Sequence, residues 1–320
     1  DVRPVADEAS FEGVSIHRTP GRHGHGQLAE EMGPVSGFVF EGDETVYVAG
    51  DTVWYEPVGA TLERFEPDLV VLNGGEARFE AGEIKHTVGT SCVMQMNIGS
   101  EVTISEHGLN TTLAYQQTGE EPHYALEGEI FTGGQALEWL VDLGILQDAS
   151  ESGVIARDVG SPGDVYFVPT FQGIATPHWD PGARGAIFGL ERGTSGDVIV
   201  RAALDGIAYR ARDAVDAMKA DSGLELGRIR IDGGMSANDF LCERIADMTR
   251  SAVDRPVVRE TTALGVAYAA GLAVGVWPDK ETISEQWQLE QAFEPEADAA
   301  SVDAEYEQWE KAIELTRQWP

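Results

Sequence analysis

The chain has 320 residues, of which 55 are acidic and 22 are basic, so its formal net charge is −33. A surface this acidic repels nucleic acids and anionic membranes, which are polyanions, and this argues against both as partners. No apolar run reaches membrane-spanning length and the chain opens with polar residues, so the expected location is the cytoplasm.

The acidic residues are spread along well-patterned segments rather than gathered in a tail. This distribution is typical of folded proteins from halophilic organisms. Because salt screens the mutual repulsion of the carboxylates, we predict that the protein needs high salt to fold. Its melting temperature should rise between low and molar potassium chloride, and a melting temperature that does not rise would contradict the prediction.

Residues 1–77 alternate short apolar segments with turns. The pattern predicts a helix and four strands, at Pro57–Phe65, Val14–His17, Ser36–Phe40, Thr45–Ala49 and Leu69–Leu72. Two loops carry residues capable of chemistry, R-H-G-H-G at 22–26 and A-G-D-T at 49–52. The stretch resembles the later part of a metallo-β-lactamase-fold hydrolase, and the resemblance implies that His23 binds a metal and that Asp51 bridges two metals.

These two ligands fall short of a working metal centre. A zinc site uses three or four protein ligands, and the chain has no H-x-H-x-D-H cluster. We therefore expect His23 and Asp51 to form a remnant that binds metal weakly, and His25 to be a solvated loop histidine. A metal-dependent hydrolase is the function that ligand count disfavours.

The fold expected for residues 1–78 is a partial αβ layer, which is half of a metallo-β-lactamase sandwich. Its apolar strand faces would lack partners, so they are expected to stay exposed or to pack on the rest of the chain. These faces comprise Phe38, Val46, Val48, Val70 and Leu72. The join to the rest of the chain falls near Glu76–Gly82, with the domain boundary between residues 78 and 79, and looks like a crossover between two genes. It carries no Gly/Ser or Pro linker, so it does not resemble a designed two-domain fusion.

Residues 228–240, R-I-R-I-D-G-G-M-S-A-N-D-F, read as a buried strand, a tight turn and the start of a helix. Glycines let a ligand approach the backbone, and a helix start offers free N–H groups to an anion or nucleotide. The alternative is an ordinary strand–turn–helix corner. Residues 84–99 similarly read as two strands around a bend with Gly89, Thr90 and Ser91, where backbone N–H groups can face phosphate oxygens.

Together with three other segments, these motifs closely resemble the C-terminal half of the glycerol kinases, in the FGGY carbohydrate-kinase family. The other three are Y-A-L-E-G-E-I-F-T-G-G-Q-A-L-E-W-L at 124–140, W-D-P-G-A-R-G-A-I-F-G-L at 179–190 and A-L-G-V-A-Y-A-A-G at 263–271. The resemblance covers about residues 79–320. It implies an α/β domain of the actin-like, ribonuclease-H-like architecture, with ATP and Mg²⁺ as cofactors and glycerol as substrate.

The resemblance also assigns roles to individual residues. Thr90 is expected to contact the nucleotide phosphates, and Gly134 and Glu138 to line the nucleotide pocket. Glu138 stands where the family often has Gln, and a carboxylate near phosphates is unfavourable. Gly234 and Asn238 are expected on the adenosine side, where Asn238 hydrogen-bonds the base or ribose.

The residues that the family uses for catalysis and for holding the polyol are mostly not matched in this sequence. The family's catalytic aspartate segment, G-D-Q-Q-A-A-L, is replaced here by P-D-L-V-V-L-N. Asp68 lies 22 residues before Thr90, the spacing expected for the base, and is the candidate catalytic residue, although we interpret the spacing as largely accidental. Val93 stands where the family places an aromatic residue against the polyol.

Three helices and two cysteines complete the expectations. Gly134 should open a helix whose apolar face is Ala136, Leu137 and Leu140, and the long helix near residue 200 should bury Ile199, Ala203, Ile207 and Ala211. A final amphipathic helix is predicted at Ala304–Arg317 after an acidic loop, Ala297–Asp303. Cys92 and Cys242 are expected to be reduced, with Cys92 in the core.

Four functions stay open at this point. The first is a glycerol kinase family enzyme, inactive alone because residues 1–77 do not resemble the front kinase domain. The second is a weak ATP-binding or interaction module that associates with intact kinase subunits. The third is a nonfunctional remnant of gene fusion, and the fourth is the metal-dependent hydrolase remnant.

Overall fold

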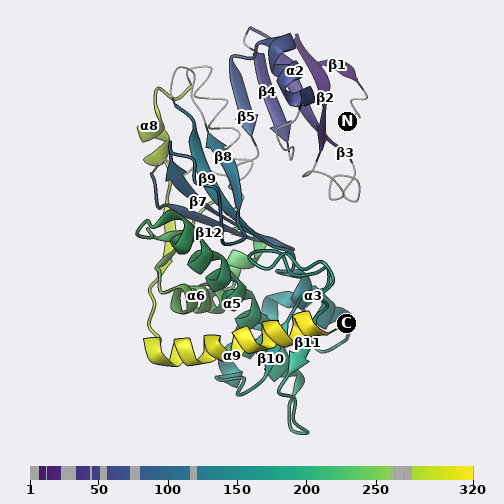
Figure 1. Ribbon diagram of the computed structural model, residues 1–320, viewed down its shortest axis with the longest axis vertical. Coiled ribbons are helices and arrows are strands. Elements are labelled where there is room, and N and C mark those ends of the chain that lie inside the picture. Colours follow the sequence, from purple (N-terminus) through teal and green to yellow (C-terminus); the bar gives the residue numbers. More distant parts are fainter. Residues whose placement is uncertain are drawn as a thin grey trace. The chain divides into compact units, whose positions relative to one another are not determined.

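A computed structural model describes residues 7–11, 13–22, 34–43, 45–50, 56–72, 80–115, 121–259, 261, 265, 268 and 276–319. The chain divides into two compact units (Figure 1). The first unit comprises residues 1–77, 113–123 and 261–287, and the second comprises residues 78–112, 124–260 and 288–320. Among the described helices, none is long and apolar enough to cross a membrane.

The first unit contains a five-stranded sheet in the order β1-β2-β3-β4-β5. Its elements are β1 (Glu8–Phe11), β2 (Val14–Arg22), β3 (Pro34–Glu41), β4 (Thr45–Gly50), α2 (Glu56–Phe65) and β5 (Leu69–Leu72). Neighbours β1 to β4 are antiparallel, whereas β4 and β5 are parallel and are connected through α2. The four predicted strands and the helix are confirmed; β2 extends five residues beyond His17, to Arg22, and β1 was not predicted.

Alternation along these strands sorts their side chains onto two faces. His17, Val39 and Tyr47 are cross-strand neighbours, and the ring of His17 lies 5.0 Å from that of Phe65 in α2. Helix α2 therefore covers this face, and Val39 and Tyr47 are fully buried. On the opposite face Phe38, Val46 and Val48 are half-buried, while the side chains of Val70 and Leu72 lie outside the described residues.

The second unit is built on a seven-stranded sheet in the order β14-β13-β12-β6-β7-β9-β8, although residues 113–115 of β8 and His123 of β9 are assigned to the first unit. The strands are β6 (Ile84–Val88), β7 (Cys92–Gly99), β8 (Asn110–Tyr115), β9 (His123–Ile130), β12 (Ile229–Asp232), β13 (Val253–Pro256) and β14 (Leu289–Phe293). Strands β6, β12 and β13 are parallel, and β7 and β14 run antiparallel to their neighbours β6 and β13. A short antiparallel pair lies apart from this sheet, β10 (Tyr166–Val168) with β11 (Ala186–Phe188).

Helices pack on this sheet around a single apolar core. They are α3 (Gln135–Asp142), α4 (Ser152–Val159), α5 (Gly196–Ser222), α6 (Asp239–Thr249) and α9 (Ala299–Gln318), with short helical turns η1 (Ala149–Glu151) and η2 (Gly234–Ala237). The described part of the first unit adds α8 (Lys280–Ser284). The predicted buried faces of α3 and α5 are confirmed, since Ala136, Leu137, Leu140, Ala203, Ile207 and Ala211 are fully buried and Ile199 is partly buried.

The prediction of an acidic loop at Ala297–Asp303 is wrong from residue 299 onward. Helix α9 begins at Ala299 because the side chain of Asp298 caps it by accepting the Ser301 N–H at 3.0 Å. The acid Asp303 lies on the helix and pairs with Arg212 at 2.9 Å. Acidic residues were interpreted as a loop signal, although an Asp cap followed by two alanines favours a helix start.

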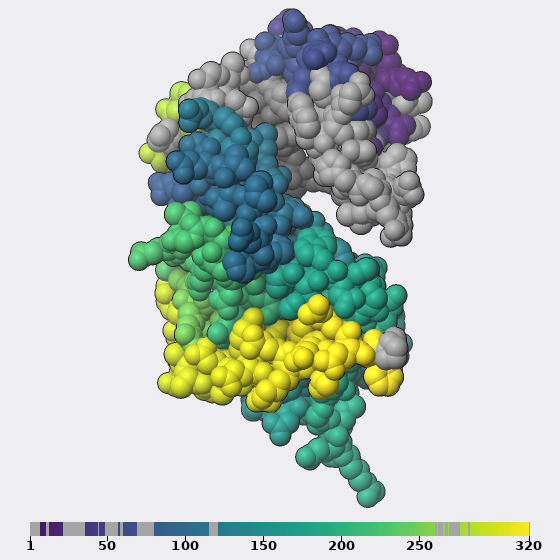
Figure 2. Space-filling model, viewed as in Figure 1, coloured from purple at the N-terminus to yellow at the C-terminus, as the bar shows by residue number. Residues whose placement is uncertain are grey.

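Helix α9 lies across the surface of the second unit, where it is coloured yellow (Figure 2). Its inner face buries Val302, Trp309, Ala312, Ile313 and Thr316. Trp309 is fully buried and its ring stacks 5.1 Å from that of Tyr209 in α5. The helix is therefore part of the core rather than an appendage.

Both cysteines are free and buried. Burial raises the pKa of the Cys92 thiol to about 12, and the same cause raises the pKa of Cys242 to about 12. Neither thiol is ionised at neutral pH, so neither is a nucleophile. The expectation that Cys92 belongs to the core is confirmed.

Candidate functional site

Two neighbouring parallel strands end at one edge of the seven-stranded sheet, and each leads into a glycine-containing turn. Strands β6 and β12 are paired up to Thr87 and Asp232. The β6–β7 turn follows one strand and Gly233–Gly234 follows the other. Gly233 has a φ of +83°, and a Cβ atom there would lie 2.7 Å from the Val88 carbonyl oxygen. Only glycine fits, because the backbones of the two turns touch.

A third turn joins them from the end of β9. The Gly133 N–H donates to the Thr90 carbonyl and the Gly134 N–H to the Gly89 carbonyl, both at 2.8 Å. A Cβ atom at Gly133 would lie 2.5 Å from the sulfur of Cys92. Sequence reasoning singled out Gly134 and missed Gly133, which is the more tightly packed of the two.

The third turn also reaches the turn after β12. A Cβ atom at Gly134 would lie 3.2 Å from Cγ of Met235, the residue after Gly234. We call the segments Gly89–Ser91, Gly133–Gly134 and Gly233–Gly234 the three glycine turns. The structure thus brings together Thr90, Gly134 and Gly234 as predicted positions of one site.

The surface of the three turns is open at two points. Thr90 and Ser91 are exposed at the β6–β7 bend, and Gly234 is exposed with no atom within 4 Å of where its Cβ would stand. Hydroxyl groups at a bend and an open glycine beside a helix start form a surface that can accept an anionic group and a flat ring.

A buried ion pair fixes the two parallel strands beneath the turns. Lys85 Nζ on β6 lies 3.1 Å from Asp232 Oδ2 on β12, and each side chain is 4% exposed. The next residue, His86, is fully buried, and desolvation lowers its pKa to about 4 despite the opposing effect of Asp232. His86 is therefore neutral at neutral pH and adds no charge to the site.

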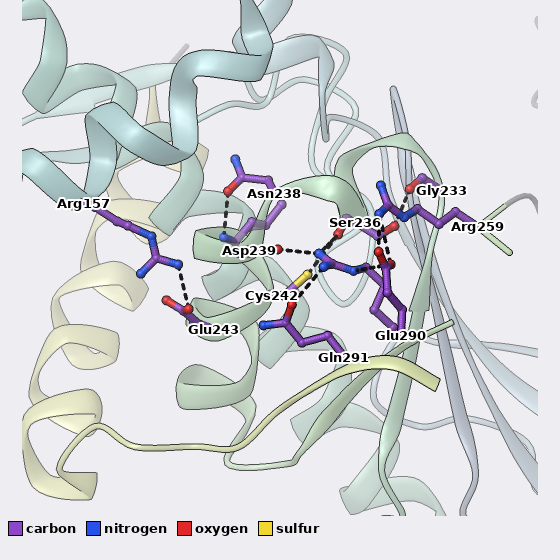
Figure 3. Close-up of polar contacts among 12 residues, drawn as sticks. Arg157, Gly233, Ser236, Asn238, Asp239, Cys242, Glu243, Arg259, Glu290 and Gln291 are labelled. Carbon is purple, nitrogen blue, oxygen red and sulfur yellow. Dashed lines mark hydrogen bonds and ion pairs between the residues drawn. The ribbon is translucent and has the colours of Figure 1, made fainter. Parts of the chain in front are cut away.

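The two remaining nucleotide candidates differ in environment. Glu138 is exposed in the first turn of α3, and its N–H donates to the Gly134 carbonyl at 3.1 Å. Asn238 is the N-cap of α6, where its Oδ1 accepts the Leu241 N–H at 3.2 Å (Figure 3). Its Nδ2 donates to Ser152 Oγ at 3.1 Å. Both polar ends of Asn238 thus make protein contacts, and its contact with a nucleotide stays a prediction.

A buried arginine that sequence reasoning missed lies behind the turn after β12. Arg255, on β13, is 4% exposed and donates to the Ser236 carbonyl at 2.8 Å and to Asp239 Oδ1 at 2.6 Å. Glu290 and Gln291 also accept hydrogen bonds from this arginine, and Figure 3 labels all four of its partners. No periodic pattern marks the arginine in the sequence, since every residue of β13 is buried.

The predicted catalytic residue, Asp68, belongs to the first unit. Asp68 is exposed in the first unit, where its Oδ2 accepts the Thr45 N–H at 2.8 Å and its own N–H donates to the Thr45 carbonyl at 2.9 Å. His23 and Asp51 lie outside the described residues. Within the part of the chain that the structure describes, no three His, Cys, Asp or Glu side chains gather as in a metal site.

Comparison with known proteins agrees with this geometry. Residues 84–274, which include all three glycine turns, match the C-terminal domain of the FGGY family of carbohydrate kinases. The chain belongs to this family. The α/β fold of the second unit is accordingly that of the actin-like, ribonuclease-H-like sugar kinases.

Curated relatives include glycerol kinases from several organisms. The chain is 42% identical to glycerol kinase of Haloarcula marismortui over 92% of this chain and 58% of that protein. It is 48% identical to glycerol kinase of Bacillus thuringiensis over 76% of this chain and 49% of that protein. The chain therefore spans about half the length of the curated relatives it matches.

Among solved structures, glycerol kinase of Plasmodium falciparum with ADP aligns at a TM-score of 0.73 and 33% identity, over 77% of this chain and 50% of that one. The expected metallo-β-lactamase character of residues 1–77 gains no support. Similarity to an isothiocyanate hydrolase from Delia radicum gut bacteria covers 23% of this chain and 31% of that one at a TM-score of 0.21, which carries no argument.

Proposed function

We propose that the second unit is the nucleotide-binding part of a glycerol kinase-type phosphotransferase, which converts ATP and glycerol to glycerol 3-phosphate. The observation that carries the proposal is the meeting of the three glycine turns at one sheet edge, with Thr90 and Gly234 open to a ligand. The family membership of the chain and the ADP complex of the Plasmodium relative support the choice of an adenine nucleotide.

Each turn has a distinct part in this proposal. The exposed Thr90 bend offers hydroxyl and backbone donors to the phosphate oxygens. Gly134 lets the third turn pack closely against the Thr90 bend, and the open space at Gly234 admits the adenosine. Bound Mg²⁺ would neutralise phosphate charge, as it does in phosphoryl transfer generally. Intact kinase subunits are the proposed protein partners, since on this proposal the three turns supply the nucleotide contacts of one domain only.

Titration calorimetry of the 320-residue polypeptide with MgATP in molar salt tests the proposal. We expect a dissociation constant in the millimolar range, about 4 kcal/mol weaker than a micromolar kinase site, because one wall supplies the contacts. Thr90→Val should weaken binding further, whereas Glu138→Gln should strengthen it by removing a negative charge near the phosphates. Absence of any binding heat at tens of millimolar nucleotide would contradict the proposal.

Catalysis by the polypeptide alone should stay at background in a coupled assay with ATP and glycerol. Positioning and electrostatics supply most of the acceleration of phosphoryl transfer, and the candidate base, Asp68, is hydrogen-bonded to the backbone of Thr45. Formation of glycerol 3-phosphate that disappears in Asp68→Asn would show this expectation to be wrong. Activity that persists in Asp68→Asn would instead indicate a contaminating kinase.

A further inference from the structure

The turn after β12 is held from behind by one short segment of the chain. The Gly233 N–H donates to the Arg259 carbonyl at 3.0 Å, and the Ser236 carbonyl accepts from Arg255 at 2.8 Å. The two contacts hold Gly233 and Ser236, which flank Gly234 in the chain. Gly234 itself is open, with no atom within 4 Å of where its Cβ would stand. The conformation of the open glycine therefore depends on residues 255–259.

A carboxylate on the edge strand joins the two arginines. Glu290 Oε2 accepts from Arg255 Nε at 3.0 Å, and both oxygens of Glu290 accept from Arg259 at 2.9 and 3.0 Å (Figure 3). Gln291 adds a contact from Arg255 at 3.1 Å. We call Arg255, Arg259 and Glu290 the arginine clamp.

Charge and burial hold the Arg255 side chain of the clamp in place. The Arg255 side chain is 5% exposed, lies 5.2 Å from the centre of the Phe293 ring and has carboxylates of Asp239 and Glu290 on two sides. The hydrogen bond that Arg259 donates to Glu290 lowers the pKa of this carboxyl group, so Glu290 is charged at neutral pH. A buried guanidinium with fixed, charged partners has few alternative positions.

We propose that the arginine clamp positions the Gly233–Gly234 turn for the adenosine part of the nucleotide. The inference rests on the proposed function, and it assigns Arg255, Arg259 and Glu290 as positioning residues that do not touch the ligand themselves. The adenosine side is expected to depend on the clamp most, because among the described residues no hydrogen bond or ion pair joins the clamp to the Thr90 bend.

The test compares Glu290→Gln with a matched control, Glu243→Gln. Glu243 is also on the surface, 40% exposed against 36% for Glu290, and it pairs with Arg157 at 2.7 Å without contacting the turn. Hydrogen exchange of the peptide that covers residues 232–238 is measured in molar salt without ligand. Exchange should be about tenfold faster in Glu290→Gln and unchanged in Glu243→Gln. Arg259→Gln is the second variant, with the same expectation, should Glu290→Gln fold poorly.

Comparing the binding of two ligands separates a local effect on the turn from a general loss of stability. In Glu290→Gln the dissociation constant for ADP should rise about fivefold to tenfold, while that for tripolyphosphate, which lacks adenosine, stays within about twofold. Unchanged exchange, or equal weakening of both ligands, would overturn the clamp. If exchange is faster in Glu290→Gln but the unsubstituted protein binds no ADP, the clamp holds the turn and the nucleotide proposal is refuted instead.

Discussion

Replacing Asp213 with alanine should lower the free energy of unfolding by about 3–5 kcal/mol, because it leaves a buried arginine without its carboxylate. The side chain of Arg210 is 3% exposed and that of Asp213 is 5% exposed, and they pair at 2.5 Å on successive turns of α5. A guanidinium cannot lose its charge to escape burial. The cost is therefore that of an unpaired buried cation rather than of one hydrogen bond.

The same carboxylate also joins α5 to the C-terminal helix. Asp213 Oδ1 accepts from the Tyr306 hydroxyl at 2.5 Å and from the Trp309 ring N–H at 3.3 Å. Alanine at position 213 would leave these two donors unsatisfied as well, which adds to the destabilisation. We expect the loss of stability to be accompanied by looser attachment of α9.

Urea denaturation in molar salt measures this effect, with Asp216→Ala as the control. Asp216 lies on the same helix, but its side chain is 46% exposed and its contact with Arg212 is 3.3 Å long. Removal of such a surface pair should change stability by less than about 1 kcal/mol. Equal effects of the two substitutions would mean that the buried network does not carry the stability assigned to it.

The fold could be predicted where periodicity is strong and the element is local. Helix α5 and the β6–β7 hairpin follow from patterns within one segment, and both are confirmed. The start of α9 was missed because a single capping side chain, Asp298, decides it. Composition alone does not distinguish acids in a loop from acids on an exposed helix face.

The candidate site was predictable only in part, for a physical reason. Glycines that permit close backbone approach are visible in sequence, so Gly134 and Gly234 could be proposed before the turns were seen to meet. The residues that hold the turns were not, because Arg255 and Glu290 are 35 positions apart and meet only through pairing of β13 with β14. Asn238 was predicted to contact the ligand, and the structure shows that its side chain also caps helix α6.

Valine at position 234 should abolish nucleotide binding while leaving the fold intact. Nothing lies within 4 Å of the Gly234 Cβ position and its φ is not in the left-handed region, so the side chain fits without a clash. It would, however, fill the space through which we propose that adenosine approaches the turn. The neighbouring Gly233→Ala should instead destabilise the protein, by about 1–3 kcal/mol, because that position has a φ of +83° and no room beside Val88.

Calorimetry with MgATP and thermal melting in molar salt separate these effects, with Gly193→Val as the matched control. Gly193 also has nothing within 4 Å of its Cβ position, and it lies outside the three glycine turns. We expect Gly234→Val to weaken binding at least about tenfold, beyond detection for a millimolar site, at an unchanged melting temperature. Gly193→Val should keep both properties. Unimpaired ATP binding in Gly234→Val would refute the assignment of this turn, because an open glycine filled by a branched side chain cannot remain the surface on which adenosine lies.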